Sequence, residues 1–165
     1  MRRDWRPIPA DDLPDRIILF DGVCVLCSRW VAFVIRHDRA ARYRFVAIQT
    51  PLGRSLAGRF GINADYPETN VVVVGGRAYF KLESALAVLA EVPGWRWTRV
   101  AYALPRVARD LLYDSIAQNR YRLFGRRATC LAPTPDVRAR FLSESFAEPR
   151  AGLGVSASRH GHAAG

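Results

Sequence analysis

The chain alternates short apolar runs with longer segments in which apolar residues recur every three or four positions. The short runs predict β-strands at residues 16–20, 43–48, 70–74 and 77–81. The strongest of these predictions is 70–74, because its consecutive valines are β-branched and suit a buried sheet. Gly75 and Gly76 supply a two-residue turn, so we expect the strands on either side to form an antiparallel hairpin.

The longer periodic segments predict helices at residues 28–38, 51–60 and 83–91. The resulting order is strand, helix, strand, helix, hairpin, helix. Two strands joined by a helix pair in parallel through a right-handed crossover, whereas the hairpin adds an antiparallel pair. The sequence therefore predicts an α/β fold of the thioredoxin-like (glutaredoxin-like) type, with a four-stranded mixed sheet and flanking helices.

We expect one domain at residues 15–147, with a core at 16–92 and a C-terminal helical extension at 95–146. The extension has helical spacing at 95–104, from 105 to about 124, and at 135–146. Residues 1–14 contain three prolines and are expected to form an irregular lead-in. Residues 148–165 are rich in Gly, Ala, Ser and His and predict a disordered tail.

The composition, 50% hydrophobic in 165 residues, is typical of a globular domain with its own core. The net charge of +10 comes from 25 basic residues, of which Lys81 is the one lysine. The arginines are dispersed, which favours solvated helix faces and makes nucleic acid an unlikely partner. No apolar run reaches the roughly 18 residues of a transmembrane segment, and residues 1–7 lack the apolar part of a secretory signal, so we expect a cytoplasmic protein.

The candidate chemistry is a Cys-x-x-Cys pair, Cys24 and Cys27, placed after the first predicted strand and at the start of the first predicted helix. Free backbone N–H groups at a helix start stabilise a thiolate. We expect Cys24 to be the more exposed sulfur and to attack a disulfide, and Cys27 to be more buried and to resolve the mixed disulfide. Asp21 could accept the Cys27 proton, or it could cap the N–H groups of Val23 or Cys24.

The Asp21, Cys24 and Cys27 trio resembles the motif of the DCC family, a domain of unknown function whose members are proposed thiol-disulfide oxidoreductases. The blocks that carry this resemblance are 20–27, 43–46, 83–86, 109–114 and 119–125. The resemblance implies a thioredoxin-like fold and a redox-active pair that acts on a protein or low-molecular-weight disulfide or thiol. We expect no bound organic cofactor.

Thioredoxin-like enzymes usually carry a cis-proline before the third strand, facing the dithiol. Here Pro67 lies too early for that role. Either Thr69 or Asn70 is therefore expected to face the cysteines, or the substrate groove differs. Val25 and Leu26, between the two cysteines, carry no base, so we expect a reducing or intermediate potential rather than a strongly oxidising one.

Other residues could also carry chemistry, and each of them has a structural interpretation as well. Zinc would need Cys130 with His37, His160 or His162 beside the dithiol, but no second close cysteine pair exists, so we expect no metal site. Cys130 is expected to be a small buried residue rather than a third redox partner. Polar residues of the extension could face the dithiol, with Arg120 stabilising a thiolate, but we favour helix bridging for this group, which comprises Asp110, Tyr113, Asn119 and Arg120.

The alternative function is a non-catalytic thioredoxin-like binding module. Its Arg-rich surface would then bind an acidic partner or a membrane surface.

Overall fold

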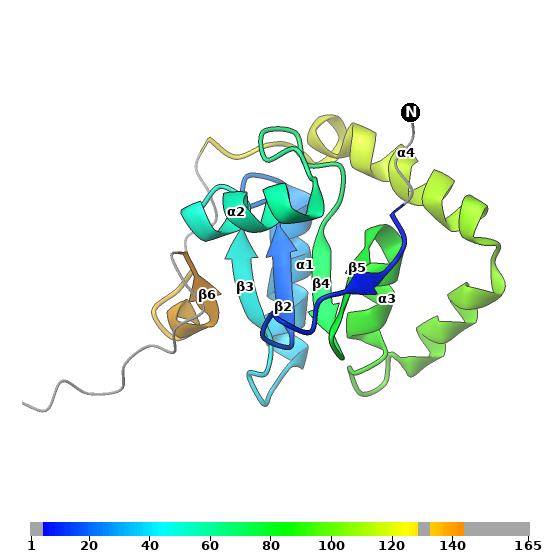
Figure 1. The fold of residues 1–165 in the computed structure, drawn as a ribbon, viewed down its shortest axis with the longest axis horizontal. Helices are drawn as coiled ribbons and strands as arrows, with labels where there is room; N and C mark the ends of the chain where they lie inside the picture. Colours follow the sequence, from blue (N-terminus) through cyan, green and yellow to red (C-terminus); the bar gives the residue numbers. More distant parts are fainter. Residues whose placement is uncertain (1–4, 129–132, 144–165) are drawn as a thin grey trace, which may run out of the picture.

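The computed structural model describes residues 5–128 and 133–143, which build a six-stranded mixed sheet with helices on both faces (Figure 1). The strand order is β1-β5-β4-β2-β3-β6. The strands are β1 (Ile8–Pro9), β2 (Ile17–Phe20), β3 (Arg44–Ala47), β4 (Val71–Val74), β5 (Arg77–Phe80) and β6 (Phe141–Leu142). β2 pairs in parallel with β3 and antiparallel with β4, and β4 pairs antiparallel with β5. The predicted thioredoxin-like arrangement of the four central strands is confirmed.

Helix α2 covers one face of the sheet, and helices α1 and α3 cover the other (Figure 1). The α-helices are α1 (Val25–His37), α2 (Pro51–Phe60), α3 (Lys81–Leu89) and α4 (Arg106–Phe124), with 3₁₀-helices η1 (Arg96–Ala103) and η2 (Arg138–Arg140). α4 packs mainly against α1 and α3. None of the helices in the described part of the chain is long and apolar enough to cross a membrane.

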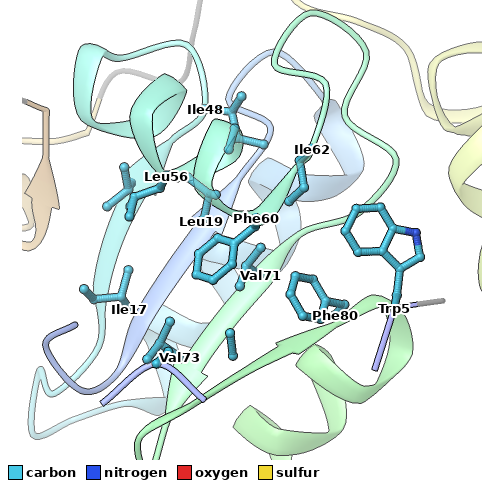
Figure 2. Packing of buried hydrophobic residues seen from close by; sticks show 14 residues of the cluster. Trp5, Ile17, Leu19, Ile48, Leu56, Phe60, Ile62, Val71, Val73 and Phe80 are labelled. Carbon is cyan, nitrogen blue, oxygen red and sulfur yellow. The ribbon is translucent and has the colours of Figure 1, made fainter. Parts of the chain in front are cut away.

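The core is divided between the two faces of the sheet because successive strand residues point to opposite sides. In β2, Ile17 and Leu19 face α2, whereas Ile18 and Phe20 face α1. Figure 2 shows the α2 side, where Phe60 lies close to Leu19. All four β2 residues are buried, as expected for a central strand covered on both faces.

The N-terminal segment differs from the predicted irregular lead-in. Ile8–Pro9 forms β1 and pairs with β5, and the Trp5 ring packs 5.2 Å from that of Phe80 (Figure 2). An edge strand tolerates proline because one side of it has no ladder partner. Local composition therefore gave the wrong answer here, and ordered structure begins before residue 15.

The segment at 135–146 was predicted to be a helix, and this is wrong for its described part. It forms the short turn η2 and then β6, which pairs in parallel with β3. Buried Arg140 holds it there by donating to Asp38 Oδ2 at 2.6 Å and to the Tyr43 carbonyl at 3.1 Å. The predicted tail at 148–165 lies outside the described residues.

Three helical predictions shift at their ends, and one of them is α3, which runs Lys81–Leu89 instead of 83–91. α1 begins three residues earlier than the predicted 28, so both cysteines lie in or at its first turn. The 95–104 segment is a 3₁₀-helix, η1, and the following helix, α4, begins directly after Pro105 as the sequence predicts.

The close packing of α2 on β3 generates a stability prediction. A Cβ at Gly53 would lie 2.0 Å from the Ala47 carbonyl oxygen, whereas a Cβ at Gly58, in the same helix, meets nothing within 4 Å. Gly53→Ala should therefore lower the free energy of unfolding by about 2 kcal/mol or more. The matched control Gly58→Ala should leave it equal or raise it by up to about 1 kcal/mol. Denaturant unfolding measures both, and an unchanged Gly53→Ala would contradict this packing.

Candidate active site

The two cysteines lie at the start of α1, just after the turn that follows β2. Cys24 is the N-cap residue, and its Sγ accepts the Cys27 N–H at 3.3 Å. Both are free thiols. The predicted position of a dithiol at a helix N-terminus is confirmed. A sulfur at the N-cap lies where unsatisfied N–H groups favour negative charge.

The two thiols differ in their pKa. A hydrogen bond between the two thiol side chains lowers the pKa of Cys24 from an ordinary 9.0 to about 7; the Cys27 backbone N–H adds to this effect, and burial opposes it. The bond between the two thiols and burial both raise the pKa of Cys27. Arg120 lowers the pKa of both thiols, and Asp21 raises the pKa of both. Cys24 is therefore the thiol of this pair that ionises first as the pH rises.

The expected difference in exposure is wrong. Cys24 is 0% exposed and Cys27 is 8% exposed. The chain just after α4, residues 125–127, pairs with the backbone on either side of Cys24, and we call it the strap. The strap forms an antiparallel bridge between Arg126 and Cys24, and the Arg127 N–H donates to the Val23 carbonyl at 2.8 Å. Arg126 and Arg127 are themselves exposed.

Asp21 is buried at the end of β2 and accepts hydrogen bonds on both carboxylate oxygens. Oδ1 accepts the Val23 N–H at 3.2 Å, which is one of the capping bonds that the sequence suggested. The Cys24 N–H instead donates to the Asp21 backbone carbonyl at 3.3 Å. Oδ2 accepts from the guanidinium of Arg120 at 3.2 Å and from the hydroxyl of Tyr121. The carboxylate thus joins the dithiol turn to α4.

Arg120 lies at this site, contrary to the helix-bridging role that we favoured. Its guanidinium also donates to the Pro67 carbonyl at 2.7 Å and lies 4.5 Å from the centre of the Tyr121 ring. Burial alone would lower the pKa of Arg120, but contacts with Tyr121, Cys27 and Asp21 raise it. The residue is therefore a buried permanent cation beside the two sulfurs.

Sequence reasoning missed Gln49 and Tyr121. Gln49 donates through Nε2 to Asp21 Oδ1 at 2.9 Å and accepts the Gly22 N–H at 2.9 Å. It directly follows the second predicted strand, and the carboxyl ends of parallel neighbours meet at one edge of a sheet, so a signal was present. Burial and the hydrogen bond to Asp21 raise the pKa of Tyr121 to about 12, so its hydroxyl stays a donor at neutral pH.

A cavity of about 190 Å³ opens beside Cys27, and we call it the Cys27 cavity. Pro67, Thr69 and Asn70 line it opposite the cysteine, as one of the two sequence-based alternatives predicted. No peptide bond in the described residues is cis. The remaining wall comes from α1 and α4, so the helical extension encloses the space in front of the dithiol.

Of the other described candidates, Tyr113 lies at the cavity beside the dithiol, and His37, Asp110 and Asn119 do not line that cavity. His37 lies at the far end of α1, with its ring 4.2 Å from that of Phe33. Asn119 donates to the Ser115 carbonyl, and Asp110 pairs with Arg106 at 3.8 Å, as helix-surface residues do. Tyr113 contributes to the Cys27 cavity and donates to Asn70 Oδ1 at 3.1 Å. Cys130, His160 and His162 lie outside the described residues, among which no cluster of three metal-ligating side chains occurs.

Comparison with known proteins adds a family. A family model for DCC1-like thiol-disulfide oxidoreductases matches residues 18–126, from β2 to the strap. The uncharacterized protein YuxK of Bacillus subtilis (strain 168) is 36% identical over 134 residues, which cover 81% of this chain and 98% of YuxK. A chloroplastic DCC family protein of Arabidopsis thaliana is 39% identical over 117 residues, 69% of this chain and 67% of that protein. No solved structure matches.

The strap yields a prediction about access to Cys24. Gly125 has φ +91°, which strains any other residue, and a Cβ there meets only Val25 Cγ2, at 3.9 Å. Gly125→Ala should loosen the strap without a clash. Because left-handed strain is worth about 1–2 kcal/mol, alkylation of Cys24 by iodoacetamide, read by mass spectrometry, should accelerate about 5- to 30-fold.

Gly94→Ala is the matched control. Gly94 has φ +83°, and a Cβ there meets nothing within 4 Å, so it carries similar strain away from the dithiol. Its Cys24 alkylation should equal that of the wild type. An unchanged rate in Gly125→Ala would mean that the strap does not limit access.

Proposed function

Because this chain belongs to the DCC1-like thiol-disulfide oxidoreductase family, we propose that it catalyses thiol–disulfide exchange through Cys24 and Cys27. The observation that carries the proposal is the placement of Cys24 at the N-cap of α1 beside Cys27, with the pKa of Cys24 lowered and that of Cys27 raised through the hydrogen bond between their side chains. A thiolate is the nucleophile of this chemistry, and a pKa near ambient pH suits the attacking group. Cys24 meets that requirement.

In the proposed first step, the Cys24 thiolate attacks one sulfur of a substrate disulfide. The substrate S–S bond breaks as the bond to Cys24 forms, and the departing thiolate takes up a proton. Cys27 then loses its proton and attacks Cys24 Sγ, which releases the second substrate thiol. The chain is left with a Cys24–Cys27 disulfide, and two electrons have passed to the substrate. A cellular dithiol reductant must return the pair to its starting state.

Asp21 is the proposed proton acceptor for Cys27, directly or through one water. Resolution requires a Cys27 thiolate, and Cys27 is the thiol with the raised pKa. The Asp21 carboxylate is buried close enough to raise that pKa electrostatically. Arg120 and Tyr121 hold the carboxylate in place, and so they act as positioning residues.

Cys24 must become accessible before it can react, because it is fully buried and the strap pairs with its backbone. We propose that substrate arrival displaces residues 125–127. The strap forms few backbone hydrogen bonds to the dithiol turn, of which Val25 N–H to the Gly125 carbonyl is long at 3.4 Å. Such a weakly held segment opens at low cost.

The substrate of this reaction is a protein or low-molecular-weight disulfide, and we propose a cytoplasmic setting. An odd number of cysteines with one close pair suits a reducing compartment, where such a pair is more often catalytic than structural.

A trapping experiment tests the proposal. The rate at which Cys24→Ser reduces a model disulfide should be lower than that of the wild type by about 100-fold or more, because the nucleophile is lost. Cys27→Ala should instead accumulate a stable mixed disulfide on Cys24, visible by mass spectrometry. Cys130→Ser is the control and should behave as the wild type. Equal, slow reduction by wild type and Cys24→Ser would exclude the enzyme and favour the binding-module alternative.

A further inference from the structure

The Cys27 cavity is walled mainly by apolar side chains. Leu26 and Trp30 come from α1, and Ile116 and Ala117 come from α4. Cys27 lies in the same wall and is the one cysteine of the pair with exposed surface. An occupant of this space is therefore in contact with the dithiol.

The charges that line the cavity are Asp21 and Arg120, and they neutralise one another at 3.2 Å. Both side chains are buried. A charged occupant would lose its hydration and would have to compete with this ion pair for a counterion, which is costly. The charge balance of the wall therefore favours a neutral occupant.

Thr69, Asn70 and Tyr113 in the cavity wall bond to one another and to the backbone, whereas the Trp30 indole N–H and the Arg120 Nε are buried without a partner. Thr69 donates to the Asn70 carbonyl at 2.8 Å and accepts the Lys81 N–H at 2.7 Å. Asn70 Oδ1 accepts from the Tyr113 hydroxyl. A polar occupant would have to replace these bonds, whereas an apolar one keeps them and buries apolar surface.

We propose that the Cys27 cavity is a subsite for the uncharged, apolar substituent next to the sulfur of the substrate disulfide. The inference rests on the proposed function and narrows its substrate class. With the substituent seated between α1 and α4, the substrate sulfur lies at the Cys27 end of the cavity. Cys24 is one hydrogen bond away from Cys27, so the bond to be attacked lies beside the thiolate.

Reduction rates of matched disulfides test the preference. Di-n-propyl disulfide and bis(2-hydroxyethyl) disulfide differ by a methyl group against a hydroxyl. Each rate is divided by the rate at which free dithiothreitol reduces the same disulfide. After this correction the wild type should reduce the propyl compound about tenfold or more faster than the hydroxyethyl compound. Cystamine and 3,3′-dithiodipropionate, which carry opposite charges, should both be slower than the propyl compound.

Two variants of α4 test whether the Cys27 cavity causes the preference for the propyl compound. Ile116 lines the cavity and is 41% exposed, whereas Leu123 lies outside its lining and is 64% exposed. Both positions are solvent-accessible, so serine at either one should be compatible with folding. Ile116→Ser should lose most of the propyl preference, and Leu123→Ser should retain it.

A binding measurement separates failure of this inference from failure of the proposed function. Benzyl methyl sulfide cannot exchange, and NMR should detect its binding through shifts of the Ile116 methyl signals in the wild type. If the thioether binds but none of the disulfides is reduced, the proposed function is refuted and the subsite is not. The subsite is overturned if the thioether does not bind, if propyl and hydroxyethyl compounds react equally, or if Ile116→Ser retains the preference.

Discussion

The buried ion pair between Asp21 and Arg120 is the contact on which the rest of the site depends. It joins the end of β2 to α4 across 99 residues of sequence and places a permanent cation beside the dithiol. Removing one partner of a buried pair leaves an uncompensated charge, which typically costs about 3–5 kcal/mol. Together with the Lys81–Asp114 and Arg109–Glu83 ion pairs, this contact holds α4 where it forms one wall of the Cys27 cavity and leads into the strap at Gly125.

The two thiols differ in pKa although the same ion pair acts on both of them. Arg120 and Asp21 act on both sulfurs with opposite sign, so neither ion alone separates their pKa values. The separation comes from the hydrogen bond between Cys24 and Cys27 and from the place of Cys24 at the helix start. Because Asp21 and Arg120 largely neutralise one another, the hydrogen bond between the two thiols determines which of them has the lower pKa.

Local sequence signals predicted the central strands, the hairpin and the dithiol at the start of α1, because each depends on periodicity or turn residues within a short window. The contacts that complete the site are long-range, and apart from Gln49, which directly follows a predicted strand, they depend on the fold and not on a local pattern. In the sequence Arg120 is typical of a helix-surface arginine, and only the folded chain places it against Asp21. In the same way, only the folded chain pairs residues 125–127 with Cys24. The edge strand at Ile8–Pro9 was hidden for the same reason, since its partner is β5.

The most direct test of this account is the titration of the Cys24 thiolate, followed by its absorbance near 240 nm and corrected with Cys24→Ser. The wild type should titrate with a midpoint of about 7, well below the ordinary 9.0. Arg120→Gln should move the midpoint to higher pH, because the cation that favours the thiolate is lost. Arg122→Gln, exposed on the same helix, should match the wild type. A wild-type midpoint near 9, or an unchanged midpoint in Arg120→Gln, would contradict the account.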